Sequence, residues 1–357
     1  VYVQQISKHL SQDHNVTVVT AEKAESFKNQ NLEFRSLNLF DADTPTDDKE
    51  VFLIEFNKRL EEVFDLKKFD IIHSHYWMSG LIAKDISKKY NIPYIFTSHS
   101  LGVFLDGYNK ERADCEKIVM SDSQFVTAST NYENNLISES YQIDKKKIKL
   151  INPGIDSELF SPDPSIKREN IFMSVGRIQE QKGQLETLLF LNYFKKIDNN
   201  FKCYIVGGPS GSSGKDYLIE LKESVQELDL ESHVEFLGSL PQVNIRDLLN
   251  RSKLLIHTSR YETFGLVAIE ANAMGVPVFT TNNGSMKEII TNKENGYLAE
   301  DINDKNVNTF IKNLTNDNQY FEEVMTICMQ KSKEYSWENT VDSLLKLYQE
   351  AKFSLKN

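Results

Sequence analysis

Cysteines, long apolar runs and surplus positive charge are all scarce in this sequence. Its three cysteines, Cys115, Cys203 and Cys328, are odd in number and far apart, so they indicate neither a disulfide framework nor a zinc site. No apolar run approaches the roughly 20 residues of a membrane-spanning helix, although contact with a membrane surface stays open. A formal net charge of −11 argues against nucleic acid as the main partner. Free thiols suit a reducing compartment, so we expect a cytoplasmic protein.

Short apolar runs alternate with polar stretches of helical period, which predicts an α/β protein with parallel sheets. A chain of 357 residues suits two domains better than one core. The turn-rich segment 152–162 is the expected boundary. We therefore predict a first domain over residues 1–155 and a second over 156–337. The expected strands are 16–20, 70–73, 94–97, 125–128, 149–151, 171–175, 204–206, 233–238, 254–256 and 278–280.

The stretch 254–278 dominates the second half. It begins with an apolar run that reads as a buried strand, and a helix is expected next. The side chains on one face of that helix are Phe264, Val267, Ala268 and Ala271. Gly275 ends the helix and Pro277 stops it from resuming. The amides of Gly265 and Leu266 then lie in the unpaired first turn, where a helix attracts phosphate.

Two glutamates of this stretch, Glu262 and Glu270, are separated by eight positions. If both lie on the helix, its rise places them about 12 Å apart. A glycosidase needs its carboxyl pair within roughly 5–10 Å, so that class is disfavoured. The separation suits the two ends of an extended ligand with a diphosphate between them. Two surface glutamates on a solvated helix are the alternative, which the apolar surroundings of Glu270 disfavour.

The residues after the expected strand 171–175 form a charged loop. Arg177 and Lys182 lie in it between Gly176 and Gly183. The carboxyl ends of parallel strands are where α/β sheets bind ligands. Two cations on one such loop suit a diphosphate leaving group, whose developing charge they stabilise. A solvated charged turn is the alternative.

Two consecutive strands of the first half end in histidines and hydroxyl groups. The first is followed by His73, His75 and Tyr76, and the second by His99 and Ser100. The two histidines of the first group share a face if the strand continues. Structural or capping roles are the alternative, but the repeated pattern at carboxyl ends favours a binding site.

Two apparent motifs fail on closer reading. Asp41 and Asp43 form a D-x-D pattern, but no convincing strand precedes them, so we expect a solvated loop and no metal site. The segment 207–215 lacks the glycine and Ser/Thr spacing of a P-loop. We expect a glycine-rich loop there instead.

The residues from Glu262 to Val278 resemble the E-x7-E motif of family-four retaining glycosyltransferases of the GT-B fold. They match the family pattern E-x-F-G-L-x-x-x-E-A-x-A-x-G-x-P-V. The resemblance implies two Rossmann-like domains facing a central cleft, the first completed by a C-terminal helix over 338–357. It implies transfer of a sugar from a nucleotide-diphosphate sugar, with UDP as the expected nucleotide and no separate cofactor. The acceptor would be a small molecule or a lipid-linked sugar.

Site residues follow from the resemblance motif by motif. The expected catalytic residues are His99, Arg177, Lys182 and Glu262. The expected nucleotide-binding residues are Gly176, Phe264, Gly265, Leu266, Val267 and Glu270, with Glu270 on the ribose. In sucrose-phosphate-synthase-like and inositol-phosphate-glycosyltransferase-like members, the positions of Tyr76, Ser100 and Arg112 hold an acceptor phosphate. The alternative is that Tyr76 packs, Ser100 caps a helix and Arg112 only pairs with Glu116.

The sequence departs from the family in three places. Asn283 and Asn295 replace family residues, and at position 283 asparagine tolerates the left-handed backbone that a glycine would take. The chain opens in a helix, without the preceding strand and glycine turn of the family, so we expect an N-terminal truncation. A GT-B sugar-nucleotide epimerase and a non-catalytic sugar-nucleotide-binding protein remain alternatives. The donor sugar, the base, the acceptor and the oligomeric state stay open.

Overall fold

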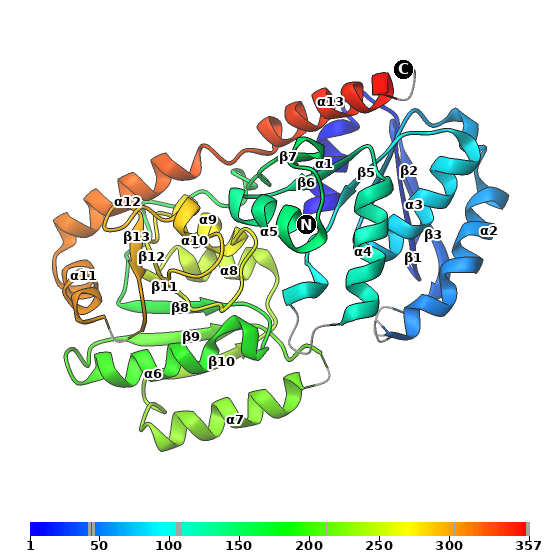
Figure 1. Cartoon of the computed structure of the whole chain (residues 1–357). Coiled ribbons are helices and arrows are strands. Elements are labelled where there is room, and N and C mark those ends of the chain that lie inside the picture. Colours follow the sequence, from blue (N-terminus) through cyan, green and yellow to red (C-terminus); the bar gives the residue numbers. More distant parts are fainter. Residues whose placement is uncertain (42–43, 45–46, 105–108, 212, 303, 355–357) are drawn as a thin grey trace. The chain divides into compact units, whose positions relative to one another are not determined.

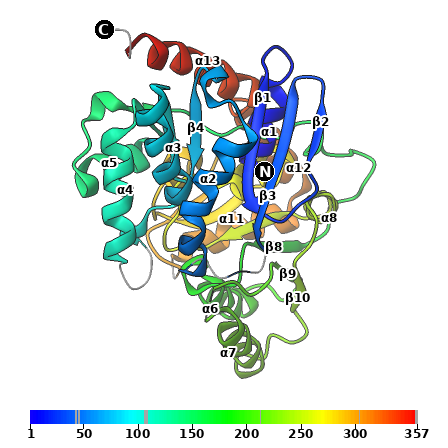
Figure 2. The same cartoon turned by 90° about the vertical axis from the view of Figure 1, so that its right-hand side faces the viewer.

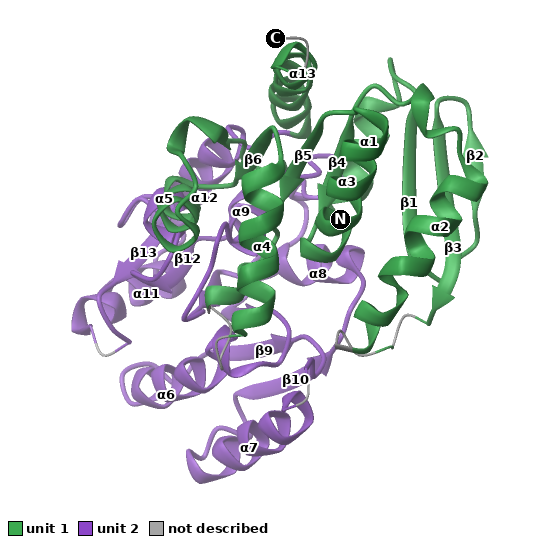
Figure 3. Cartoon of the chain, turned by 45° about the vertical axis from the view of Figure 1, so that its right-hand side comes forward, with its two compact units in different colours: residues 1–154, 337–357 green, residues 155–336 purple. Residues whose placement is uncertain are grey.

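A computed structural model describes residues 1–41, 44, 47–104, 109–211, 213–302 and 304–354. The chain divides into two compact units, shown in Figure 3. Unit 1 comprises Val1–Gly154 and Trp337–Asn357, and unit 2 comprises Ile155–Ser336. The division lies one residue before the boundary expected from the sequence. Among the described residues, no helix is both long and apolar enough to cross a membrane.

Unit 2 is built on one six-stranded parallel sheet (Figure 1). Its strands are β8 (Ile171–Val175), β9 (Lys202–Val206), β10 (Val234–Gly238), β11 (Leu254–His257), β12 (Val278–Thr281) and β13 (Gly296–Ala299). Their spatial order is β10-β9-β8-β11-β12-β13, which is the Rossmann order 3-2-1-4-5-6. The order reverses between β8 and β11, so these two central strands define the point where such sheets bind ligands.

Helices cover both faces of this sheet. They are η5 (Glu180–Lys182), α6 (Gln184–Lys195), α7 (Gly214–Glu227), α8 (Gln242–Leu249), α9 (Leu266–Ala273), α10 (Met286–Ile289), α11 (Lys305–Asn316) and α12 (Asn318–Ser332). One face packs on α6, α7, α11 and α12, and the other on α8, α9 and α10. Leu254 and Ile256 point into the first core and Leu255 into the second, as the two-residue period of a strand requires. This double burial explains the continuous apolar runs that predicted these strands.

Unit 1 contains two sheets rather than the single sheet expected. β4 (Ile72–His75), β5 (Tyr94–Thr97), β6 (Phe125–Ala128) and β7 (Ile148–Leu150) form a parallel sheet in chain order. β1 (Val16–Glu22), β2 (Phe27–Asn29) and β3 (Leu32–Phe40) lie side by side in a second sheet (Figure 2). The hairpin of β2 and β3 was not predicted from the sequence, because its strands are only half-buried or exposed and carry a weak apolar pattern.

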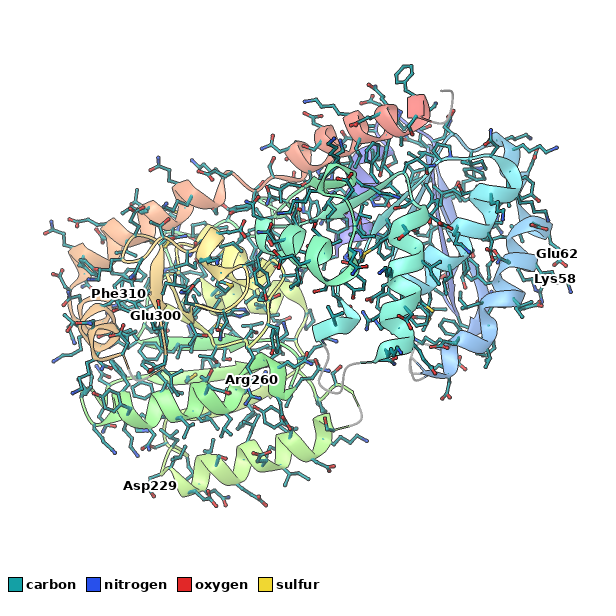
Figure 4. The ribbon with its side chains drawn as sticks, viewed as in Figure 1. Lys58, Glu62, Asp229, Arg260, Glu300 and Phe310 are labelled. Carbon is teal, nitrogen blue, oxygen red and sulfur yellow. The ribbon has the colours of Figure 1, made fainter. Side chains whose placement is uncertain are left out.

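The helices of unit 1 are α1 (Tyr2–Leu10), η1 (Asp47–Phe52), α2 (Leu53–Val63), η2 (Leu66–Lys68), α3 (Trp77–Tyr90), η3 (Gly102–Phe104), α4 (Lys110–Asp122), α5 (Asn131–Tyr141), η4 (Lys145–Lys147) and α13 (Trp337–Ser354). On one face of the β4–β7 sheet, α3, α4 and α5 pack around Phe96. On the other face, α1 and α13 pack around Ile95. The outer side of α2 is charged, with Lys58 and Glu62 3.9 Å apart and both exposed (Figure 4).

The structure corrects two expected elements. The strand expected over 70–73 is β4, which runs on to His75 because Ser74 and His75 still pair with Phe96 and Thr97. The last helix, expected from residue 338, begins at Trp337.

Candidate active site

The loops that follow β8 and β11 lie at the carboxyl edge of the unit 2 sheet, where the strand order reverses. The first loop carries Arg177 and Lys182, and the second carries Glu262. Nζ of Lys182 lies 2.9 Å from Oε2 of Glu262. The structure therefore brings together two of the catalytic residues expected from the sequence. Arg177 is exposed, and its guanidinium has no partner among the described residues.

The Lys182 loop is fixed to the end of β11. Gly183 has φ +69°, and a Cβ there would lie 2.0 Å from the carbonyl oxygen of Thr258. Oγ1 of Thr258 donates to the carbonyl oxygen of Gly183 at 2.6 Å, and the amide of Arg260 donates to the carbonyl of Gln181 at 2.8 Å. The Lys182 side chain also runs past Gly176, whose Cβ position would be 3.8 Å from it. Only glycine fits at position 183, and this close approach sets where Lys182 begins.

The side chain of Arg260 strengthens the same connection. Its Nε and Nη2 donate to Oε1 of Glu186 at 2.9 and 2.8 Å. Glu186 lies in the first turn of α6, which begins directly after Gly183. The loop after β11 is therefore bonded through the backbone and the side chain of Arg260 to the segment around Lys182, which includes the start of α6.

A histidine that sequence reasoning missed completes the surroundings of Glu262. Nε2 of His257 lies 3.3 Å from Oε2 of Glu262, the oxygen that also accepts from Lys182. Burial alone would raise the pKa of Glu262, but His257 and Lys182 outweigh it and hold that pKa at about 2. Glu262 is therefore a carboxylate throughout the physiological range. In the sequence, His257 only follows the apolar run of a buried strand, so nothing there marks it as functional. Its contact with Glu262 becomes visible only in the structure, where it lies at the end of β11.

The backbone of Glu262 is held by the loop after β12. The amide of Ser285 donates to the carbonyl oxygen of Glu262 at 3.0 Å. Gly284 has φ +64°, and a Cβ there would lie 2.4 Å from the same oxygen. The left-handed residue is therefore Gly284, and Asn283 does not need the left-handed backbone that asparagine would tolerate. The close approach to Glu262 requires a glycine at 284, so Asn283 can be an ordinary residue.

Helix α9 begins later than expected. Its first residue is Leu266, and Gly265 caps it with φ +90°. Glu262 precedes the helix, so only four of the eight steps to Glu270 follow the helical rise, or about 6 Å. The expected separation of about 12 Å therefore rested on a wrong helix start. Phe264 is outside the helix but still buried, with its ring edge-on to Tyr335 at 5.6 Å.

The first turn of α9 presents free donors. Within the described part of the chain, the amides of Leu266 and Val267 have no acceptor, as expected for a helix start. Four residues beyond Leu266, the half-buried Glu270 accepts a hydrogen bond from Nε2 of Gln242 at 3.2 Å. Burial raises the pKa of Glu270 to about 7, although the bond from Gln242 lowers it in part. Glu270 therefore titrates near neutral pH.

In unit 1, three histidines gather at the carboxyl ends of β4 and β5. Rings of His73 and His75 lie 4.1 Å apart between centroids, so they share a face as the sequence predicted. Nδ1 of His75 is 2.9 Å from Nε2 of His99. His99 has φ +59°, a conformation uncommon for a residue with a Cβ. Burial lowers the pKa of all three rings, to about 3 for His73 and about 4 for His99.

Arg112 contacts both of the other expected acceptor residues, Ser100 and Tyr76. Nη2 of Arg112 donates to both the carbonyl oxygen and Oγ of Ser100 at 2.9 Å. The guanidinium of Arg112 lies 4.8 Å from the ring centre of Tyr76. Tyr76 has φ +77° and ψ +151°, a region that residues other than glycine rarely enter.

The alternative pairing of Arg112 exists as well. Its Nε donates to Oε1 of Glu116 at 2.7 Å, and both side chains are buried. Oε2 of Glu116 accepts from the amide of Gly102 at 2.9 Å and from the hydroxyl of Tyr141. Arg112 pairs with Glu116 and with Ser100 at the same time, because the donors of its planar head point in different directions, and its phosphate role stays a prediction.

The remaining sequence motifs lie outside these clusters. Asp41 pairs with Lys23 at 3.0 Å, and Asp43 lies outside the described residues. The described residues contain no group of three or more His, Cys, Asp or Glu that could hold a metal ion. In the glycine-rich segment 207–215, Ser212 is not described, and Gly214 begins α7.

Two family models together match almost the whole chain. The model described as Glycosyltransferase Family 4 matches residues 1–159, and the model described as Glycosyl transferases group 1 matches residues 156–333. The chain is a family-four glycosyltransferase. This confirms the resemblance found in its motifs and the expectation that the protein is a transferase enzyme.

Two curated relatives of this glycosyltransferase share one name. The D-inositol 3-phosphate glycosyltransferase of Corynebacterium urealyticum is 29% identical over 305 residues, which cover 78% of this chain and 71% of the relative. The protein of the same name from Rhodococcus jostii is 29% identical over 307 residues, covering 79% of this chain and 67% of the relative.

Solved structures confirm the GT-B fold of this glycosyltransferase. Sucrose-phosphate synthase from Thermosynechococcus elongatus superposes with a TM-score of 0.85 at 21% identity, covering 98% of this chain and 92% of the other. The Anabaena protein HepE, solved with UDP and glucose, superposes with a TM-score of 0.79 at 16% identity, covering 97% and 94%.

Proposed function

We propose that this glycosyltransferase is a retaining enzyme that needs no metal ion and moves a sugar from a UDP-sugar to a phosphorylated acceptor, such as a sugar phosphate or an inositol phosphate. The observation that carries the donor half is the contact of Lys182 with Glu262 at the point where the strand order of unit 2 reverses. The names of the relatives and the UDP bound to HepE support the choice of acceptor and donor. A cytoplasmic location stays a prediction.

In this proposal the diphosphate binds at the loop after β8 and the start of α9. Arg177 and Lys182 supply positive charge, and the amides of Leu266 and Val267 supply donors. The bond from the sugar C1 to the diphosphate oxygen breaks, and its electron pair stays on UDP. The two cations stabilise the charge that develops there, which is why a metal is not needed. Glu270 accepts from the ribose hydroxyls.

Retention requires the acceptor oxygen to reach C1 on the face that the diphosphate leaves. The acceptor hydroxyl then bonds to C1, and its proton passes to the departing phosphate oxygen. Glu262 accepts from hydroxyls of the donor sugar, and its low pKa keeps it ionised for that task. His99 is the proposed contact of unit 1 with the donor sugar.

The acceptor phosphate is assigned to Tyr76, Ser100 and Arg112. A guanidinium and two hydroxyl groups match the oxygens of a phosphate monoester. Arg112 is already oriented by Glu116, Ser100 and the Tyr76 ring, so its head needs little reorganisation to accept a ligand.

The test is a donor and acceptor screen that measures UDP release and identifies the product. A phosphorylated acceptor should be used at least about tenfold better than its unphosphorylated form, the effect of one charge-assisted interaction. Nuclear magnetic resonance of the product should show that C1 keeps its configuration. Better use of unphosphorylated or lipid-linked sugars would refute the phosphate site and leave the donor half standing.

The same screen decides between the proposal and its rivals. An epimerase would convert the nucleotide-sugar with no acceptor present, and a binding protein would bind UDP without turnover.

A variant tests the phosphate site directly. Arg112 should be replaced together with its buried partner, as Arg112→Gln with Glu116→Gln, because a lone buried carboxylate costs several kcal/mol. This double variant should lose the preference for phosphate while donor hydrolysis continues.

A further inference from the structure

Two imidazole rings of unit 1 are hydrogen-bonded directly to each other. Nδ1 of His75 lies 2.9 Å from Nε2 of His99, and the ring centroids are 5.1 Å apart. His75 is the last residue of β4, and His99 follows the end of β5, the strand beside it. Only His99 has a part in the proposed reaction. The contact raises the question of what His75 does to it.

A hydrogen bond between two neutral imidazoles needs one donor and one acceptor. If Nδ1 of His75 carries the proton, Nε2 of His99 accepts it and His99 keeps its own proton on Nδ1. If Nε2 of His99 carries the proton, Nδ1 of His75 accepts it and His75 keeps its own proton on Nε2. In either case both rings adopt the same tautomer. Burial, which lowers the pKa of both rings, keeps them neutral at physiological pH.

His75 is itself held in place from two sides. Its ring lies 4.1 Å from that of His73, tilted by 35° between the ring planes. Nδ1 of His73 bonds the Tyr348 hydroxyl and its Nε2 bonds Oγ1 of Thr97, each at 2.8 Å. Tyr2 lies edge-on to His75 at 5.8 Å and to His99 at 5.1 Å. Residues of α1, α13 and β5 thus set the orientation of the His75 ring, and this does not depend on its bond to His99.

We propose that His75 is a positioning residue that ties the tautomer of His99 to its own and sets the orientation of the His99 ring. This inference rests on the proposed function only for the role of His99 at the donor sugar. With Nε2 of His99 engaged by His75, Nδ1 is the nitrogen left for a ligand. It is a donor in one tautomer and an acceptor in the other, so the tautomer decides whether a sugar hydroxyl accepts from His99 or donates to it, and therefore which other groups that hydroxyl can bond. The left-handed backbone of His99 agrees with a residue held for function.

The direct test uses nitrogen-15 resonances of histidine side chains in the intact protein, which has seven histidines. Signals of His75 and His99 are assigned by single replacements. In the unchanged protein, both rings should show the same single neutral tautomer. In His75→Phe, the His99 signals should move to a mixture of tautomers, because no neighbouring ring then couples to the tautomer of His99. Opposite tautomers in the unchanged protein, or a His99 spectrum unaffected by His75→Phe, would overturn the proposal.

The kinetic test separates positioning from folding. His75→Phe should lower kcat by about 10- to 100-fold, the loss typical when the partner orienting a functional histidine is removed. The Kd for UDP should not change, because the residues proposed to bind UDP belong to unit 2. His75→Asn should recover most of kcat, and His14→Asn on the exposed surface should match the unchanged protein. Full kcat in His75→Phe would refute the role.

The two tests keep this inference distinct from the proposed function. If the unchanged protein transfers no sugar, the proposed function fails, while the tautomer measurement still decides whether His75 controls His99. If His75→Phe does not fold, the matched tautomers of the unchanged protein and the behaviour of His75→Asn decide the question. If His75→Asn folds normally but has no measurable kcat, the result counts against the proposal.

Discussion

Lys182 and Glu262 are in contact at 2.9 Å across a sequence separation of 80 residues. Their side chains keep 22% and 15% of their exposure, so the pair is shielded but reachable. The lysine belongs to the loop after β8 and the glutamate to the loop after β11, the two strands that flank the reversal of the sheet. A diphosphate that binds Lys182 must share it with Glu262, which couples the proposed leaving-group site to the proposed sugar site.

Replacing Lys182 should lower turnover more than donor affinity. In Lys182→Met, kcat should fall by about 10²–10³, because the charge on the departing diphosphate loses a stabilising cation. The Kd for UDP should rise less than about tenfold, since Arg177 and the start of α9 still bind it. Steady-state kinetics and calorimetry with UDP measure the two effects.

Lys215→Met serves as the matched control, because this lysine is exposed and belongs to the glycine-rich segment. It should leave kcat and Kd unchanged. An equal loss of UDP affinity and of kcat/KM, with kcat intact, would assign Lys182 to simple binding rather than to the leaving group.

UDP binding should strengthen as the pH rises through about 7. Because burial raises the pKa of Glu270 to about 7, the group is mostly protonated below that pH and mostly ionised above it. The ionised form accepts the ribose hydroxyls more strongly, so affinity should fall by up to about tenfold per pH unit below the pKa. Calorimetry at a series of pH values measures this.

Glu270→Gln isolates the contribution of Glu270 from the titration of UDP itself. It should weaken binding at high pH by about 1.5–3 kcal/mol, the value of a hydrogen bond to a charged group. UDP affinity should also depend less on pH in the variant than in the unchanged protein, because the variant lacks the titrating carboxyl group. If UDP affinity has the same pH profile in the two proteins, Glu270 does not bind the ribose.

Activity should survive a chelator. The proposed mechanism assigns the stabilisation of the leaving group to Arg177 and Lys182. UDP release in EDTA should therefore equal that in buffer. A loss of activity that Mn²⁺ or Mg²⁺ restores would contradict the metal-free mechanism.

The protein should be more stable with glycine at position 76 than with alanine there. The Tyr76 φ of +77° with ψ of +151° lies in a region that costs residues with a Cβ about 1–3 kcal/mol. Tyr76→Gly and Tyr76→Ala both lose the ring that lies against Arg112, so their difference isolates the backbone. Urea unfolding should place the glycine variant about 1 kcal/mol above the alanine variant.

The control is the same pair of replacements at Asp85, an exposed position inside α3. There the order should reverse, with alanine more stable by about 0.5–1 kcal/mol, because a helix interior disfavours glycine. If alanine is also the better residue at position 76, the backbone there is not strained.

Local patterns predicted much of the fold. The apolar runs of β5, β6 and β8 were found at their observed bounds, because strands covered on both faces have strong and continuous apolar signals. The hairpin of β2 and β3 was missed because its faces are partly solvated. The start of α9 was misplaced because Phe264 has the spacing of a helical core residue, although it packs on Tyr335 from the loop.

By itself, the sequence determined the α/β class, the glycosyltransferase family and the loops that carry Arg177, Lys182 and Glu262. These depend on residue type and on spacing over short stretches, which a chain carries before it folds. Only the tertiary structure decided that His257 shares an oxygen of Glu262 with Lys182, and that His75 bonds His99. Those contacts join separate loops whose meeting depends on strand order and on close approaches such as Gly183 to Thr258, and no local pattern encodes them.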